Sequence, residues 1–195
     1  MPGNPKVEDY DSAVYDSLYE AVVDLGLPLS FHILTSQGDT TATERGPKLN
    51  AFLSIIRGCQ DLMGVFILGG VFERHPKLKV VCVEADADRV SHYMYCMDQA
   101  YDRHCYWLPA GTLSKVPSEF FRENINTTFQ DDWLAFKSTD MLNPHRLMWA
   151  NDFPHSDSTW PDSQELLRKP AQSLTPDEKN WILHDNVAGL YGLSI

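Results

Sequence analysis

Hydrophobic residues follow two patterns that alternate along the chain. Four short runs are apolar almost throughout, which favours strands buried in a sheet, and they span residues 27–33, 78–83, 125–129 and 147–150. Between these runs the apolar residues recur at helical spacing, most clearly over residues 88–107. Strands that alternate with amphipathic helices predict an α/β fold with a parallel sheet and right-handed crossovers.

Capping and helix-breaking residues place the remaining elements. Asp11 or Ser12 is expected to cap a first helix that ends before Gly26. Thr175 and Glu178 form a capping box, which predicts the start of the last helix. Other helices are predicted over residues 47–74 with a break at Gly69–Gly70, over residues 131–138 and from about Pro161, with loops at 35–46 and 109–123.

The composition is that of a globular protein and narrows the choice of partners. The 195 residues are 43% hydrophobic and 22% charged, which predicts one domain over residues 1–195. A net charge of −11 argues against nucleic acid and anionic membranes as partners. No apolar run is long enough to span a membrane and the N-terminus lacks a secretory pattern, so a cytoplasmic location is expected. The four cysteines, which form no CxxC pair, are expected to be small buried hydrophobic residues in a reducing compartment.

Each apolar run is followed by polar or ionisable residues. The carboxyl ends of parallel strands meet at one edge of a sheet, where ligands bind in α/β folds, so these side chains are expected to lie together. Imidazole and carboxylate groups suit a divalent metal such as zinc. The residues at the four ends are His32; Glu84 and Asp86; Gln130, Asp131 and Asp132; and Asp152 and His155.

Each of these residues also has a structural interpretation. His32 fits a metal ligand and a satisfied core histidine equally well. Glu84 could pair with Arg89, and Asp152 could cap the helix that follows it. Asp86 or Asp88 is expected to cap the long helix, and Asp131 is expected to cap the helix that begins there.

Four stretches, taken in order, resemble the amidohydrolase-related metal-dependent hydrolases. The resemblance is to the branch that includes aminocarboxymuconate-semialdehyde decarboxylase, and it covers essentially the whole chain. It rests on Gly26-Leu-Pro-Leu-Ser-Phe-His32, on residues 70–80, on Trp149-Ala-Asn-Asp-Phe-Pro-His155 and on residues 185–192. It implies the C-terminal half, about four β/α units, of a TIM-type (β/α)8 barrel.

The resemblance also implies roles for particular residues. His32 would bind a divalent metal, zinc first and manganese second, and Asp152 would be a metal ligand or a base. Glu84 stands where the decarboxylases carry a catalytic histidine, and a glutamate can also transfer protons. The His-x-His pair that the family's first strand supplies to the metal is absent from these 195 residues.

Two functional hypotheses follow from this half-barrel. The first is a metal-dependent hydrolase or decarboxylase that acts on a small organic acid, ester or amide. The second is an inactive half-barrel, or a subunit that needs a missing N-terminal half or a second copy of the chain, and then binds no metal alone. A whole barrel needs about 250 residues, and an uncovered half would expose strand edges and an inner face.

Substrate contacts are expected near the polar strand ends. The candidates are His155, Phe129, Trp133 and the loop over residues 35–46. A flavodoxin-like binding module is a weaker third hypothesis. The segment after the first strand lacks the Gly-rich phosphate loop that nucleotide binding requires.

Overall fold

A four-stranded parallel sheet organises the chain. The computed structural model describes residues 1–3, 5, 7–32 and 57–194. The strands are hydrogen-bonded in chain order, β1-β2-β3-β4, and every neighbouring pair is parallel. Their bounds are β1 (Leu29–His32), β2 (Val80–Val83), β3 (Ile125–Phe129) and β4 (Leu147–Trp149). All four carboxyl ends therefore lie at the same edge.

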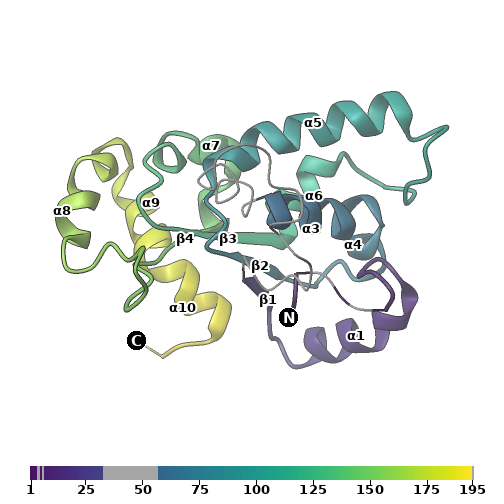
Figure 1. Cartoon of the computed structure of the whole chain (residues 1–195), viewed down its shortest axis with the longest axis horizontal. Helices are drawn as coiled ribbons and strands as arrows, with labels where there is room; N and C mark the ends of the chain where they lie inside the picture. Colours follow the sequence, from purple (N-terminus) through teal and green to yellow (C-terminus); the bar gives the residue numbers. More distant parts are fainter. Residues whose placement is uncertain (4, 6, 33–56, 195) are drawn as a thin grey trace.

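Helices connect successive strands, as the alternating pattern predicts. Figure 1 shows α3, α5 and α6 together on one side of the strands, with α5 extending well beyond the sheet. The helical segments are η1 (Ala13–Tyr15), α1 (Asp16–Asp24), α3 (Arg57–Leu68), α4 (Val71–Arg74), α5 (Asp88–His104), α6 (Pro117–Asn124), η2 (Ala135–Lys137), α7 (Thr139–Leu142), η3 (Pro144–Arg146), α8 (Ser163–Arg168), η4 (Pro170–Ser173), α9 (Pro176–Asn180), the π-helix η5 (Trp181–Asp185) and α10 (Asn186–Tyr191).

One predicted loop and one predicted helix were wrong. Residues 109–123 do not form a loop throughout, because Pro117 at the first helical position and the capping side chain of Glu119 start α6. The helix predicted over residues 131–138 begins later, as η2 followed by α7.

The break at Gly69–Gly70 is confirmed, with Gly70 in the left-handed region at a φ of 71°. The predicted loop over 35–46 and the residues 47–56 lie outside the described part.

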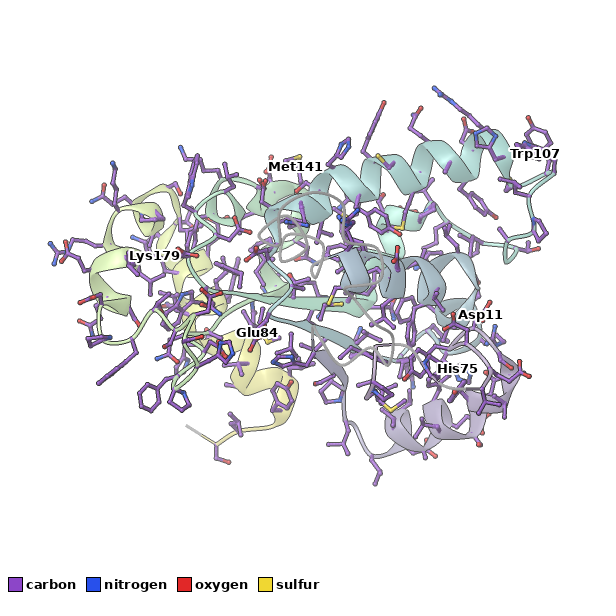
Figure 2. The ribbon with its side chains drawn as sticks, viewed as in Figure 1. Asp11, His75, Glu84, Trp107, Met141 and Lys179 are labelled. Atoms are coloured by element: carbon purple, nitrogen blue, oxygen red, sulfur yellow. The ribbon has the colours of Figure 1, made fainter. Side chains whose placement is uncertain are left out.

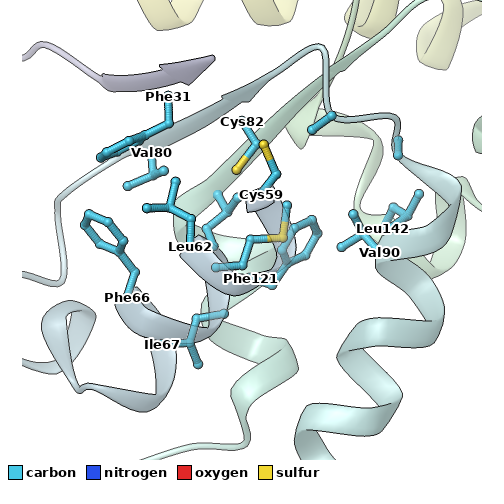
Figure 3. Packing of buried hydrophobic residues seen from close by; sticks show 14 of the residues in the cluster. Phe31, Cys59, Leu62, Phe66, Ile67, Val80, Cys82, Val90, Phe121 and Leu142 are labelled. Atoms are coloured by element: carbon cyan, nitrogen blue, oxygen red, sulfur yellow. The ribbon is translucent and has the colours of Figure 1, made fainter. Parts of the chain in front are cut away.

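The hydrophobic core lies between the sheet and the helices on one of its faces. Leu29, Phe31, Val80 and Cys82 alternate with polar or separately packed residues along β1 and β2, so they share one face of the sheet. Figure 3 shows Phe31, Leu62 and Phe66 packed together beneath β1 and β2. The Phe66 ring lies 5.5–5.8 Å from four other aromatic rings, those of Tyr10, Tyr19, Phe31 and Phe72.

The last helix lies on the opposite side of the sheet. The Ser30 hydroxyl in β1 is 3.2 Å from the Tyr191 hydroxyl in α10. The Asn186 amide donates to the carbonyl oxygens of Pro144 and Leu147 at 2.7 Å, which fixes the start of α10 against β4. In Figure 1 this helix lies below the strands, across from α3. Helices therefore lie on both sides of the sheet.

The cysteines divide into a buried pair and an exposed pair. Cys59 in α3 and Cys82 in β2 are buried, and their sulfur atoms lie close together in Figure 3. Cys96 and Cys105 are exposed, so the prediction of a buried position was wrong for these two residues. Cys96 lies in the middle of α5, beside the buried Met94 and Met97, and Cys105 directly follows the helix. All four thiols are free.

None of the helices in the described ranges combines the length and the apolar composition that crossing a bilayer requires.

We expect Phe66→Ala to lower the free energy of unfolding by about 3–5 kcal/mol, because it leaves a cavity among four aromatic rings. Urea denaturation followed by circular dichroism measures this. Tyr95→Ala is the control, since Tyr95 is largely exposed and its loss should change stability by no more than about 0.5 kcal/mol. Equal losses for the two variants would contradict the assignment of the core.

Candidate active site

Three of the four strand ends contribute to one group of ionisable side chains. His32 ends β1, and its Nε2 lies 2.8 Å from Oε1 of Glu84, the residue that follows β2. The His32 side chain is 47% exposed and that of Glu84 is 18% exposed, so the pair lies partly open to solvent. Figure 2 marks Glu84 in the middle of the molecule, beside the sheet. The alternative pairing of Glu84 with Arg89 is not observed.

Asp152 brings a second carboxyl group to this pair. The Asp152 side chain is only 16% exposed, and its Oδ2 lies 3.1 Å from Nδ1 of the more exposed His155. No N–H or hydroxyl group in the described part of the chain donates to Asp152 Oδ2, which is buried. The Asp152 carboxyl group lies within hydrogen-bonding reach of the Glu84 carboxyl group. A buried polar atom of this kind is costly unless another group neutralises it.

The backbone at these strand ends adopts an unusual conformation. Glu84, Asp86 and Asp152 have φ values of 56°, 48° and 58°, in the left-handed region that residues other than glycine seldom adopt. Backbone strain of this kind costs about 1–3 kcal/mol per residue and is concentrated at functional sites. Neighbouring hydrogen bonds hold it in place: the Glu84 N–H donates to Thr128 Oγ1 at 2.8 Å, and the Phe153 N–H donates to Asn151 Oδ1 at 3.1 Å.

The environment of Glu84 favours its protonated form. Burial raises the pKa of Glu84, and the neighbouring carboxyl group of Asp152 raises it further. The hydrogen bond and the charge of His32 act in the opposite direction and lower it, but the pKa remains above the ordinary value for glutamate. A carboxyl group with a raised pKa is a better proton donor at a given pH than an ordinary glutamate, because more of it is protonated.

The donor atoms fit a divalent metal in kind but are few in number. Imidazole nitrogen and carboxylate oxygen are ligands that zinc and manganese accept, and Asp152 Oδ2 is a buried oxygen to which no N–H or hydroxyl group of the described residues donates. Within residues 1–3, 5, 7–32 and 57–194, however, no three His, Cys, Asp or Glu side chains are arranged to hold a metal ion.

The end of β3 has a structural role that the sequence interpretation assigned to other residues. Asp132 Oδ2 accepts from the N–H groups of Ala87 and Asp88 at 2.8 Å and so caps the first turn of α5. The prediction that Asp86 or Asp88 caps α5 was therefore wrong. The prediction that Asp131 caps the next helix was also wrong, because η2 begins at Ala135, whose N–H donates to Asp132 Oδ1 at 3.3 Å. Spacing along the chain could not reveal this cap, because the acceptor comes from a different strand end.

The candidate pocket residues occupy different environments. Phe129 is buried in the hydrophobic core, with its ring 5.2 Å from that of Phe136, so a ligand would reach it only if the core opened. Trp133 is half-exposed and lies under the ammonium group of Lys137. Two exposed aromatic side chains that the sequence interpretation did not single out, Phe153 and Trp160, pack edge to face at 4.9 Å beside Asp152. The roles of Phe129, Trp133 and His155 in binding substrate stay predictions.

The parallel sheet with this cluster at its carboxyl edge is the arrangement expected of α/β enzymes. The amidohydrolase family model matches residues 2–193. The chain belongs to the amidohydrolase family. The predicted family and the predicted fold class, four β/α units of a TIM-type barrel, are confirmed.

Solved structures with the same fold include three decarboxylases. The 5-carboxyvanillate decarboxylase from Sphingomonas paucimobilis has a TM-score of 0.79 and 21% identity, over 100% of this chain and 58% of that one. The enzyme of this kind from Novosphingobium aromaticivorans, complexed with manganese and 4-hydroxy-3-methoxy-5-nitrobenzoic acid, has a TM-score of 0.77 and 20% identity, over 99% and 55%. The 2,6-dihydroxybenzoate decarboxylase from Rhizobium has a TM-score of 0.71 and 16% identity, over 94% and 57%. The chain thus spans about half the length of the structures it matches.

The raised pKa of Asp86, which follows β2, can be tested by mutation. Burial, and then the charge of Asp132, raise the pKa of Asp86 from 3.8 to about 6. A carboxyl group with a raised pKa stabilises the fold fully below its unfolded value and loses this contribution as the pH rises through about 6. We therefore expect Asp86→Asn, which stays neutral, to gain about 1–3 kcal/mol over the wild type between about pH 4 and pH 7.5.

Urea denaturation at the two pH values measures the difference. Asp102→Asn is the control, because Asp102 lies exposed on α5 and its replacement removes the same charge. A gain that is the same for both variants, or absent for Asp86→Asn, would contradict the predicted pKa.

Proposed function

We propose that the chain carries the site of a metal-dependent decarboxylase or hydrolase that acts on a small organic acid, with decarboxylation of an aromatic carboxylic acid as the first candidate. The single observation that carries the proposal is the meeting of His32, Glu84 and Asp152, with Asp152 Oδ2 buried and no N–H or hydroxyl group of the described residues donating to it. Membership of the amidohydrolase family supports it. The choice of decarboxylation draws on the three similar structures, which are enzymes for aromatic acids.

His32 and Asp152 would hold the metal. A bound divalent cation would polarise a carboxylate or carbonyl oxygen of the substrate and offset the negative charge of Asp152. The complex from Novosphingobium aromaticivorans contains manganese, which supports a divalent metal here and favours manganese over the zinc that the sequence suggested. Histidine together with aspartate is compatible with either ion.

Glu84 would supply the proton in decarboxylation. Loss of CO2 breaks the bond between the carboxyl carbon and the substrate, and the electron pair left on the substrate carbon must accept a proton. Glu84 is suited to this step because burial and the Asp152 carboxyl group raise its pKa. Its Oε1 is held 2.8 Å from His32 Nε2, so the side chain is positioned beside the proposed metal ligand. In hydrolysis the same carboxylate would remove a proton from water.

A second candidate is a subunit that acts only with further ligands from another polypeptide. It is favoured by the absence of any metal-holding group of three or more His, Cys, Asp or Glu side chains within the described ranges. The partner would be a second copy of the chain or a chain that supplies the remaining metal ligands. A cytoplasmic location is the setting proposed for either candidate. The two are distinguished by whether the isolated chain binds metal.

We expect the purified chain to bind Mn2+ with one-to-one stoichiometry, and His32→Ala and Asp152→Asn each to weaken binding at least tenfold, by the loss of a ligand. Isothermal titration calorimetry measures the affinity. His92→Ala is the matched control, because His92 is exposed on α5, and it should leave the affinity unchanged. Absence of Mn2+ binding by the isolated chain would favour the second candidate. Equal affinity in all three variants would exclude the proposed ligands.

We expect Glu84→Gln to lower the rate of CO2 release from an aromatic acid such as 5-carboxyvanillate by about 10²–10⁴-fold, the usual contribution of a general acid. The amide keeps the size of the side chain and cannot deliver a proton. Manganese content, measured by atomic emission, should stay at the wild-type level. A rate equal to that of the wild type would remove Glu84 from the mechanism, and loss of the metal would instead make Glu84 a ligand.

A further inference from the structure

A cavity lies at the opposite end of the strands from the His32–Glu84–Asp152 cluster. It has a volume of about 470 Å³, within the range of small-molecule sites. Its walls come from the segments that precede β1, β2 and β4 and from α10, which lies across them. The lining consists of Val23, Gly26, Leu27, Pro28, Lys77, Lys79, Asn126, His145, Arg146, Asp185, Asn186, Gly189 and Leu190.

The charge of this cavity is opposite to that of the chain. Lys77, Lys79 and Arg146 line it, although the chain has 27 acidic residues and only 16 Lys and Arg. Among the described lining residues Asp185 is the one carboxylate, and its Oδ1 lies 2.6 Å from Nδ1 of His184. Three cations against one carboxylate, itself paired with a histidine, leave a positive potential inside the cavity.

Two of the cations also have a structural role. Lys79 Nζ donates to the Glu123 carbonyl at 2.7 Å, and Arg146 Nε donates to the Arg122 carbonyl at 3.1 Å. These carbonyls end α6, where positive charge is favourable. Each of these two contacts uses only one N–H group of the side chain. The terminal nitrogen atoms of Arg146 and the ammonium group of Lys77 donate no hydrogen bond within the described part of the chain.

The positions of these cations are electrostatically costly. Burial lowers the pKa of Lys79, and the charge of Arg146 lowers it further. Burial likewise lowers the pKa of Arg146. Glu123 opposes both effects, but its carboxylate pairs with Lys115 at 2.5 Å. An anion in the cavity would offset the burial of two like charges.

We propose that this cavity binds a small organic anion, a carboxylate on an apolar body, between the sheet and α10. The donor groups of Lys77 and Arg146 would contact the carboxylate. Leu27, Pro28 and Leu190 would contact the apolar part. This apolar wall favours an organic carboxylate over inorganic phosphate, which has no apolar surface to bury.

The proposed ligand site is separate from the metal site. Lys79 directly precedes β2 and Arg146 directly precedes β4, whereas Glu84 and Asp152 follow those strands. Strands of three to five residues separate the two ends by roughly 10–15 Å. An anion here would bind without contacting His32, Glu84 or Asp152, so it can be tested with the metal site disabled.

The test is a titration of the full chain carrying Asp152→Asn with benzoate, followed by two-dimensional NMR. Saturable shifts are expected for Leu190 and Gly26, with a dissociation constant of about 0.1–5 mM. Lys77→Glu should weaken binding about three- to tenfold, because it reverses a charge at the cavity. Lys169→Glu, at an exposed residue outside the lining, makes the same change in net charge and should leave the affinity unchanged.

A second pair of variants tests the cavity without changing a charge: one variant fills it and the other is the control. A Cβ at Gly189 would meet no atom of the described residues within 4 Å beyond its own stretch of helix, so a side chain can start from this position. Gly189→Trp should occupy the cavity and weaken benzoate binding more than tenfold, whereas Gly189→Ala should not. Unchanged affinity in Gly189→Trp, equal affinity in the two Glu variants, or no saturable binding would overturn the proposal. Inorganic phosphate binding as tightly as benzoate would overturn the choice of an organic anion.

Discussion

The parallel pairing of four consecutive strands is the constraint on which the rest of the structure depends. Because every strand runs the same way, His32, Glu84 and Asp152 reach one edge of the sheet although they are 52 and 68 residues apart in sequence. The same pairing collects Lys77, Lys79 and Arg146 at the other edge. Acidic groups with imidazole thus lie at one end of the strands, and cations line a cavity at the other.

Much of the fold could be predicted from the sequence, because strand and helix signals are local. The apolar run at 125–129 coincides with β3, and the glycine break at 69–70 separates α3 from α4. Interactions between distant segments could not be predicted. Asp132 caps α5 from a different strand end, and α6 starts at a proline within a stretch without a clear apolar pattern. The exposure of Cys96 depends on which face of α5 packs against the rest of the chain, since Met94 and Met97 beside it are buried, and Cys105 is exposed after the end of that helix.

The sequence predicted which strand ends contribute to the candidate site, but not the hydrogen bonds and backbone angles within it. Strand ends indicated His32, Glu84 and Asp152, and the structure brings these three together. The hydrogen bond between His32 and Glu84 and the left-handed φ values of Glu84 and Asp152 depend on the turns after the strands, which the pattern of apolar residues does not determine. These turns carry two partly buried carboxyl groups side by side. Two neighbouring carboxylates repel each other, and a proton or a cation between them removes this repulsion.

Family membership and the half-barrel sheet agree with a site that holds a cation at this edge. The most direct measurement is anomalous X-ray scattering at the manganese absorption edge from crystals of the chain soaked in Mn2+. We expect one strong peak about 2.0–2.3 Å from a nitrogen of His32 and an oxygen of Asp152. A peak elsewhere, or no peak while Asp152 Oδ2 keeps its buried position, would contradict a metal site formed by these residues.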